Sequence, residues 1–566
     1  MQNIMADVIV HDAAMAELIR DLQKSINLMV ESKKAKVVKS KEKEMKDKPP
    51  VDFSKFENYF EFSCPVRFIK PHQVLALNRG ESLKALSVKI NVPESFLLQL
   101  QGLVGRRWLH RPGSSKERED MIKTSFEDAY KRLVVPLVQR QARTGLTRTA
   151  EEASIEVFLS NLRSLLLAPP LRSTSLLAVD PGFRHGCKLA VLGPGGELLE
   201  HGVILPKLGG GGEPPNSPAL RRLVDLVMKH RVATVAIGNG TACREVEGLV
   251  SGLIQARMFG GQQVRYTIVS EQGASIYSCS PLAQQEFPGL DTNIVSAVSI
   301  GRRLQDPLSE LVKIEPQHLG VGMYQHDLPQ ARLKKALDEV VVECVSFVGA
   351  DLNSCSPHLL QRVAGLNTAR AKALVAWREE NGGFTCRDEV RKVKGIGAKV
   401  FQQCAGFLRL REPKDLLDTT NIHPESYGAA RKLVAKAGLG LDQLGSPDFR
   451  EKMKRWAGGQ QLAKLAEEVE VGEPTLLLML EALQQARDHD LRQESAAPLF
   501  RSGMVRLEDV REGEQLTGRV ANVTHFGAFV DVGLGKVFAP VTSGPPVPFA
   551  PPTHAVFRMV WCTPAR

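Results

Sequence analysis

Two short glycine turns constrain this chain more than any other feature. Ala-Gly-Leu-Asn at residues 364–367 and Lys-Gly-Ile-Gly at residues 394–397 each precede a stretch with helical periodicity. Glycine in such a turn allows positive φ, and the first N–H groups of the following helix can bind a phosphate oxygen. The pair therefore predicts a tandem helix-hairpin-helix with nucleic acid as its ligand. Two tight turns between packed helices are the alternative.

The binding residues follow from this geometry. We expect main-chain N–H groups near Gly365, Asn367, Gly395 and Gly397 to contact the sugar–phosphate backbone, with Lys399 adding positive charge. Phosphate contacts of this kind carry no sequence information. The expected partners are therefore RNA and/or DNA, bound without regard to base sequence.

Charge and composition agree with a polyanionic partner. The chain has 566 residues, of which 43% are hydrophobic, so several domains are expected. An excess of 74 Lys and Arg over 63 Asp and Glu gives a net charge of +11, and such a surplus favours nucleic acid. A diffuse solvated surface would give the same balance.

The sequence also indicates a compartment. Its nine cysteines form no CxxC pair, which is typical of free thiols in a reducing environment. The first residues lack a secretion signal, and no apolar run reaches membrane-spanning length. We expect an intracellular protein of the nucleus or cytoplasm, with no membrane partner, no structural zinc and no cofactor.

The N-terminal part is predicted to be helical. Residues 1–50 contain one amphipathic helix, without a visible partner, followed by a Lys-rich segment that is read as a linker. Residues 51–170 show helical periodicity and few strand-like alternations. Basic clusters at residues 106–111 and 140–148 could face nucleic acid, although a solvated face is the favoured interpretation.

A change to alternating strands and helices begins near residue 174. Strands are predicted at 175–179, 187–192, 197–205, 232–237 and 264–269, with helices at 220–230 and 243–258. A β-hairpin followed by α/β units is typical of a ribonuclease-H-like fold, here assigned to residues 173–315. The whole chain is thus expected to be mainly α-helical, with one such α/β domain.

Ribonuclease-H-like folds often carry carboxylates at strand ends that hold two metal ions. Asp180 ends the first strand and Glu271 follows the last, so the two acids could meet at one sheet edge. A third acid is not evident, because the helix that begins at Asp291 presents mainly apolar residues. Two acids make a poor two-metal site. We therefore expect a vestigial acidic site, no metal and no enzyme activity, with a metal-dependent nuclease of the RuvC and YqgF type as the alternative.

The rest of the chain is divided into four segments. The tandem helix-hairpin-helix is expected within residues 316–415 and a small helical module within 416–500. Residues 505–535 resemble the first strands of an oligonucleotide-binding barrel of the S1 type, in which Phe526 and Phe529 could stack on bases or pack in the barrel core. Prolines after Lys536 predict that the later strands are missing, so that 536–566 form a divergent tail and the barrel is incomplete.

Longer runs of residues carry a family resemblance. They are Asp-Pro-Gly-Phe-Arg-His-Gly from residue 180, Ile-Gly-Asn-Gly-Thr-Ala from 237, Ser-Glu-Gln-Gly-Ala-Ser-Ile-Tyr-Ser from 270, and the stretches 297–314, 320–327 and 421–427. These runs resemble the Tex family of transcription accessory proteins, including its YqgF-like domain, and most of all the eukaryotic branch with an S1 RNA-binding domain. The resemblance spans most of residues 53–535. A fragment or isoform with a substituted tail would account for the divergent ends.

The resemblance implies a non-catalytic nucleic-acid-binding scaffold linked to transcription or RNA metabolism. In catalytic relatives of the YqgF and RuvC type, the third acid lies on the helix after the last strand, where this chain has Val295 or a neighbour. That departure argues further against nuclease activity. A scaffold that binds proteins of the transcription or translation machinery, including ribosome-associated proteins, is the remaining alternative.

Overall fold

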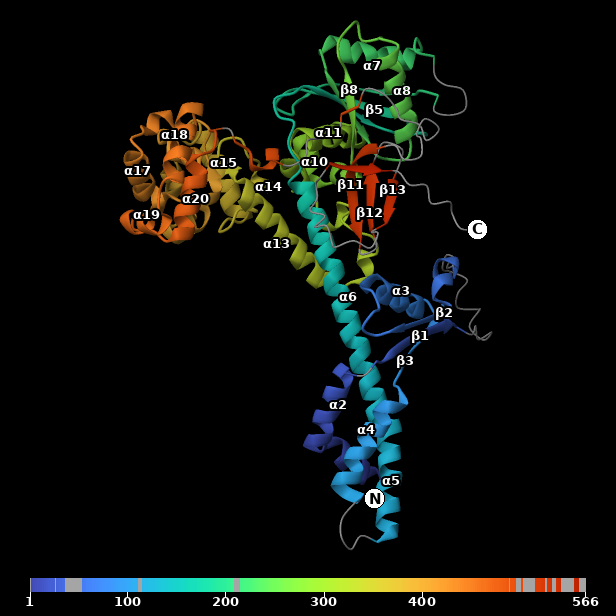
Figure 1. Cartoon of the computed structure of the whole chain (residues 1–566). Helices are drawn as coiled ribbons and strands as arrows, with labels where there is room; N and C mark the ends of the chain where they lie inside the picture. The colour runs from blue at the N-terminus through green and yellow to red at the C-terminus, as the bar shows by residue number, and fades with distance from the viewer. Residues whose placement is uncertain are drawn as a thin grey trace. The chain divides into compact units, whose positions relative to one another are not determined.

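The computed structural model describes residues 2–25, 27–35, 53–109, 115–207, 214–487, 489–494 and 500–501, and the backbone of four strands beyond residue 514. The chain divides into two compact units (Figure 1). The N-terminal unit comprises Met1–Val157 and Tyr324–Pro329, and the C-terminal unit comprises Phe158–Met323 and Gln330–Arg566. Within the described residues, no helix is both long and apolar enough to cross a lipid bilayer.

The N-terminal unit combines helices with a small antiparallel sheet of order β2-β1-β3. Its α-helices and strands are α1 (Gln2–His11), α2 (Ala13–Ser25), β1 (Met29–Lys34), β2 (Glu61–Pro65), α3 (Pro71–Ser82), β3 (Leu86–Asn91), α4 (Glu94–Val104), α5 (Lys116–Ala129) and α6 (Val135–Leu166), the last of which contributes residues to both units. One hydrophobic core joins α2 to α4 and α5, with Met15, Phe96 and Leu100 almost fully buried.

Two expectations for this unit were wrong. The apolar stripe of α2 has a partner, because Met15, Ile19 and Leu22 are buried in the shared core. The segment interpreted as a linker begins instead as strand β1, in which Val30 and Ser32 are buried while Lys33 and Lys34 are exposed. Alternation of this kind lets a charged sequence form a strand with one buried face. Residues 36–52 of the predicted linker lie outside the described residues.

The C-terminal unit contains a five-stranded sheet of order β6-β5-β4-β7-β8. Strands β4 (Leu176–Asp180), β5 (Cys187–Leu192) and β6 (Leu198–Ile204) form an antiparallel meander, while β7 (Thr234–Gly238) and β8 (Arg265–Val269) continue parallel to β4. This is the ribonuclease-H-like arrangement that the sequence predicts, and all five predicted strands are confirmed.

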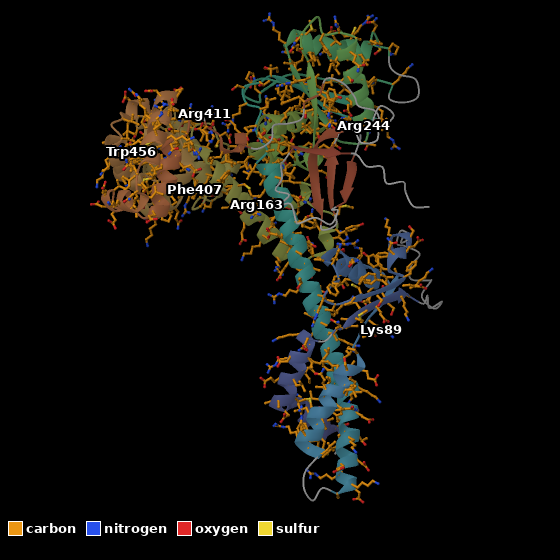
Figure 2. The ribbon with its side chains drawn as sticks, in the orientation of Figure 1. Lys89, Arg163, Arg244, Phe407, Arg411 and Trp456 are labelled. Atoms are coloured by element: carbon orange, nitrogen blue, oxygen red, sulfur yellow. The ribbon has the colours of Figure 1, made fainter. Side chains whose placement is uncertain are left out.

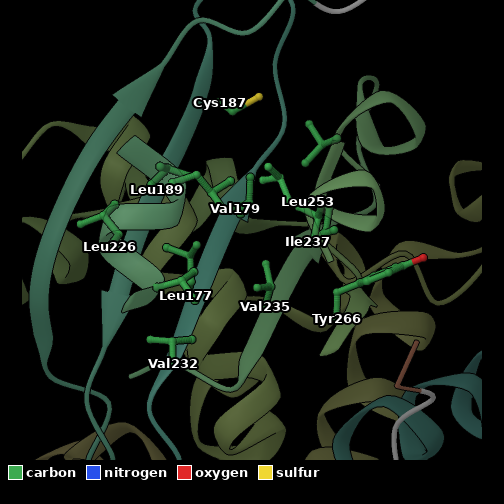
Figure 3. Packing of buried hydrophobic residues seen from close by; sticks show 14 of the residues in the cluster. Leu177, Val179, Cys187, Leu189, Leu226, Val232, Val235, Ile237, Leu253 and Tyr266 are labelled. Carbon is green, nitrogen blue, oxygen red and sulfur yellow. The ribbon is translucent and has the colours of Figure 1, made fainter. Parts of the chain in front are cut away.

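Helices cover both faces of this sheet. The helices α7 (Pro218–Lys229) and α8 (Cys243–Gln255) pack on one face, where Leu177, Val179 and Val235 are fully buried (Figure 3). The helix α11 (Thr292–Gln305) packs on the other face, against Leu176 and Ala178. Because both faces are covered there, β4 and β7 are largely continuous apolar runs, whereas β6 alternates between partly buried and exposed residues. Shorter helices α9 (Ala274–Ser278), α10 (Pro281–Glu286) and α12 (Pro307–Leu311) complete this region.

The predicted hairpin region follows a long helix. Its elements are α13 (Gln330–Val348), β9 (Ala350–Asp351), α14 (Pro357–Leu360), α15 (Thr368–Asn381), the 3-10 helix η7 (Arg387–Lys392), α16 (Ala398–Cys404) and β10 (Leu408–Arg409), and β9 pairs in parallel with β10. Arg163 of α6 (Figure 2) and Glu343 of α13 form an exposed ion pair, with 3.0 Å between Nη2 and Oε2.

A second helical module begins after residue 415. The helices α17 (Tyr427–Lys436), α18 (Pro447–Gly458), α19 (Leu462–Glu468) and α20 (Glu473–Leu483) enclose their own core, which includes Leu433, Phe449 and Leu476. The chain then returns to the ribonuclease-H-like region. Arg492 is 1% exposed and pairs with Asp490 and Asp306, and the main chain of Arg501 forms an antiparallel bridge with Tyr266 of β8.

The C-terminal strands form an antiparallel sheet of order β13-β12-β11-β14. The expectation that strands are missing after Lys536 was wrong, because β11 (Gln515–Thr524) and β12 (Gly527–Asp531) are followed by β13 (Lys536–Pro540) and β14 (His554–Arg558). The prolines do not break these strands: Pro540 ends β13, five more lie between β13 and β14, and Pro564 follows β14. Proline is tolerated at strand ends and in connections because it need not donate there to the ladder.

Candidate nucleic-acid interface

The first hairpin joins α14 to α15. Gly365 has φ +80°, and the N–H of Leu366 donates to the carbonyl of Val363 over 3.0 Å. A Cβ atom on Gly365 would lie 2.9 Å from the Cβ of Gln403, so the position requires glycine for both its φ and its packing. Asn367 caps α15 by accepting the N–H of Arg370 over 2.9 Å.

The second hairpin repeats this turn between η7 and α16. Gly395 has φ +88°, and the N–H of Ile396 donates to the carbonyl of Val393 over 3.1 Å. Gly397 occupies the N-cap position, where its φ of −86° suits any residue and no side chain caps the helix. The first N–H groups of a helix have no acceptor within it, so those of α16 are open to a ligand.

One arginine joins the two turns. The guanidinium of Arg370 donates from Nε to the carbonyl of Gly395 over 3.0 Å and from Nη1 to the carbonyl of Gly365 over 2.9 Å. Charge-assisted hydrogen bonds of this kind hold their partners firmly. The two helix N-termini are therefore fixed side by side, where they can contact neighbouring phosphates of one nucleic acid.

The turns are accessible. Asn367, Gly395, Gly397 and Lys399 are exposed, and Gly365 is half-buried. The neighbouring Lys394 is also exposed, and it adds a second positive charge to the second turn. Beside them the Arg391 guanidinium lies 4.3 Å from the ring centroid of Phe401. By contrast, the nearby Arg411 (Figure 2) pairs with Asp351 over 3.1 Å, which offsets its charge.

A third turn, between α19 and α20, was not anticipated from the sequence. Glu470 takes the left-handed conformation with φ +60°, and Gly472 caps α20, which begins with Glu473. Glu470 also lies 3.3 Å from Lys432. Acidic side chains at a helix N-terminus interact with the helix dipole themselves and repel phosphate. This turn resembles the other two in its backbone but is unsuited to their ligand.

The acidic pair does meet at one sheet edge. Asp180 ends β4, and the Glu271 carboxylate packs against the turn after β7, with Oε2 3.0 Å from where a Cβ of Gly238 would lie. Burial raises the pKa of Asp180, while Lys188 opposes that shift. Burial also raises the pKa of Glu271, and the charge of Asp180 raises it further. The same Cβ position of Gly238 is 3.1 Å from Cδ of Pro181, the residue after Asp180, so the two acids lie at the same part of the sheet edge.

The residues at this edge do not fit a two-metal site. The position expected for a third acid holds Ser296, whose hydroxyl hydrogen-bonds Asp180, whereas Val295 is buried in the core. Asp291 caps α11 by accepting the N–H of Asn293 over 2.8 Å. Nowhere in the part of the chain that the structure describes do three or more His, Cys, Asp or Glu residues gather as metal ligands. A serine and two carboxylates supply too little negative charge for two divalent ions.

The other predicted sites fall into two groups. The basic clusters of the N-terminal unit are largely paired with acids: Arg107 with Asp12, Arg143 with Glu81, and Arg148 with Glu152. This agrees with a solvated face. Phe529 lies in β12, opposite Phe538 of β13, and only its backbone is described. Phe526 lies outside the described residues.

Comparison with known proteins identifies the family. Models of the "Tex central region-like" region and the "Tex protein YqgF-like domain" match residues 1–158 and 174–305. The chain belongs to the Tex family. A "helix-hairpin-helix motif" model matches residues 345–409, and an "HHH domain" model matches residues 415–492. The tandem hairpin is thus confirmed, and the helical module that follows is a further helix-hairpin-helix domain.

Several Tex-family relatives are similar over most of this chain. The S1 RNA-binding domain-containing protein 1 of Homo sapiens is 40% identical over 585 residues, covering 95% of this chain and 58% of the relative. The Transcriptional accessory protein Tex of Neisseria gonorrhoeae is 38% identical over 485 residues, covering 85% of this chain and 61% of the relative. The Protein tex of Bordetella pertussis is 38% identical over 506 residues, covering 85% of this chain and 60% of the relative. The chain thus spans about three fifths of the length of these relatives.

Proposed function

We propose that this Tex-family chain is a non-catalytic scaffold that binds the backbone of RNA or DNA. One observation carries the proposal: two exposed glycine turns present helix N-termini side by side, and Arg370 fixes their spacing. Helix N-termini offer unsatisfied N–H groups and a positive dipole to phosphate. Lys394 and Lys399 add charge at the second turn.

The biological setting is drawn from the relatives. Two of them bear names that refer to transcription accessory function or to RNA binding, which supports a role in transcription or RNA metabolism. We propose an intracellular location, in the nucleus or cytoplasm, where such nucleic acids are found. Proteins of the transcription or translation machinery, including ribosome-associated proteins, are the proposed protein partners.

A charge-reversal experiment tests the binding site. In the double variant Lys394→Glu/Lys399→Glu, affinity for labelled RNA, single-stranded DNA and duplex DNA should fall about tenfold or more, and the slope of log K against log salt should become shallower by about 1–2. The matched control is Lys452→Glu/Lys454→Glu on α18, where Lys452 already pairs with Asp448. This control should bind as the unaltered chain does.

Equal losses in the two double variants would indicate a general charge effect and contradict the proposed interface.

The same labelled nucleic acids, incubated with Mg²⁺ or Mn²⁺, test for cleavage. Intact substrate is expected, whereas cleavage that is lost in Asp180→Asn would establish a nuclease instead. Protein partners that remain bound after nuclease treatment of a pull-down would favour the protein scaffold.

A further inference from the structure

The acidic edge of the ribonuclease-H-like sheet contains a buried lysine that the nucleic-acid function does not use. Lys188 lies in β5, directly opposite Asp180 of β4 in the antiparallel register. Residues opposite one another in such a pair project from the same face of the sheet. Lys188 is only 9% exposed, so its side chain is held against the sheet rather than in bulk water, on the same face as the Asp180 carboxylate.

The chain around Lys188 encloses its ammonium group. The loop after β4 passes close by, since a Cβ on Gly182 would lie 3.2 Å from the Lys188 Nζ and 2.8 Å from the carbonyl oxygen of Gly186. The positive charge of Lys188 reaches three carboxyl groups, and it favours the ionised form of Asp180, Glu271 and Asp291. Asp180, the residue opposite Lys188 in the register, is the one for which Lys188 is the leading charge.

A second cation, Arg303, offsets part of the charge of Glu271. Arg303 of α11 is 5% exposed, and its positive charge opposes the rise in the pKa of Glu271. Its Nη1 donates to the carbonyls of Ser270 and Gln272 over 2.8 Å each. The half-buried carboxylates of Asp180 and Glu271 thus lie within reach of two buried cations. Buried charges are tolerated when they are compensated, and here the chain's own Lys188 and Arg303 supply part of that compensation.

We propose that Lys188 takes the electrostatic place of the metal ion at this sheet edge, so that its fixed charge, and not a divalent ion, offsets the charge of Asp180. A divalent ion would have to enter beside a fixed ammonium, which is a compact charge of the same sign. This inference deepens the proposed non-catalytic function and rests on it.

The test removes the ammonium and measures metal binding rather than activity. For the full chain, addition of about 1 mM Mn²⁺ should leave the thermal midpoint unchanged, and the Mn²⁺ resonance signal should remain that of the free ion. In Lys188→Met the midpoint should be lower without metal. It should rise by about 2–4 °C when Mn²⁺ exceeds its dissociation constant about tenfold.

Two variants show whether that response comes from this site. The Mn²⁺ response of Lys188→Met should disappear when Asp180→Asn is added. The matched control is Lys229→Met, because Lys229 is an exposed lysine of the same domain that pairs with Glu200 over 2.7 Å. This control should show no response to Mn²⁺.

Two outcomes would overturn the inference. One is Mn²⁺ binding by the unaltered chain that Asp180→Asn abolishes. The other is a midpoint loss in Lys188→Met/Asp180→Asn equal to the sum of the two single losses, because two charges that stabilise each other must be coupled. If Lys188→Met does not fold, the inference is still tested by comparing Mn²⁺ binding to the unaltered chain with Mn²⁺ binding to Asp180→Asn. Loss of nucleic-acid binding is measured separately, so failure of either proposal can be recognised by itself.

Discussion

A single substitution at Gly397 can separate binding from folding. Asp fits this position because the backbone has φ −86° and ψ 177°, and no heavy atom outside the adjoining residues lies within 4 Å of a Cβ built there. At the N-cap its carboxylate would accept N–H groups of the first turn of α16. Asp is a better cap than Gly by a few tenths of a kcal/mol, and its charge adds about 0.3–1 kcal/mol through the helix dipole. We therefore expect Gly397→Asp to be at least as stable as the unaltered chain.

Gly397→Asp should weaken nucleic-acid binding even though it does not reduce stability. The added carboxylate would lie at the helix N-terminus, close to the phosphate charge. Two like charges about 4 Å apart repel by about 1 kcal/mol in water and about 4 kcal/mol near a protein surface. A loss of about 1–3 kcal/mol, or roughly tenfold to a hundredfold in Kd, is the expected result.

The neutral variant Gly397→Asn is the matched control, because Asn367 already caps the corresponding helix of the first hairpin. It should bind within about threefold of the unaltered chain, since it adds a cap without adding a charge. Fluorescence anisotropy with labelled duplex and single strands, repeated at several salt concentrations, measures both variants, and thermal unfolding verifies their stability. If the Asp and Asn variants are folded and bind equally well at low salt, the helix N-terminus does not contact phosphate and the reasoning is refuted.

Two further predictions concern the stability of the hairpins and of the sheet. Arg370→Met removes two hydrogen bonds that join the turns, so chemical denaturation should show a loss of about 1–3 kcal/mol; an unchanged free energy of unfolding would show that the turns keep their spacing without it. Hydrogen bonds from Lys229, His230 and Arg222 lower the pKa of Glu200 from 4.5 to about 2. Since a lowered carboxyl pKa stabilises the fold above the unfolded pKa, Glu200→Gln should unfold at a lower temperature at pH 7, and its difference from the unaltered chain should shrink as pH falls from 4.5 towards 2. A difference that is independent of pH would contradict the assigned ion pairs.

Local patterns predicted much of the fold. Continuous apolar runs such as Leu176–Val179 form buried strands because both faces of their sheet are covered. The glycine turns were equally readable, because positive φ at Gly365 and Gly395 is a local backbone requirement. Strand β1 was missed because its charged residues conceal the alternation, and β14 was missed because the prolines before it suggested a break.

The third turn was missed for a different reason. A left-handed residue is expected to be glycine, and Glu470 is not. Its signal in the sequence was Gly472 just before a new apolar periodic stretch, which gives the helix N-terminus but not the conformation of the preceding residue.

By itself, the sequence determined the five strands of the ribonuclease-H-like sheet, where the two glycine turns lie, and that Asp180 and Glu271 lie at strand ends of that sheet. Only the tertiary structure decided that Arg370 bridges both turns and that Lys188 faces Asp180. The physical reason is the separation along the chain between the residues that each feature depends on. Turn conformation and strand periodicity depend on neighbouring residues, whereas a guanidinium that spans two hairpins and a lysine opposite a carboxylate depend on packing and register between segments that are separate in the chain.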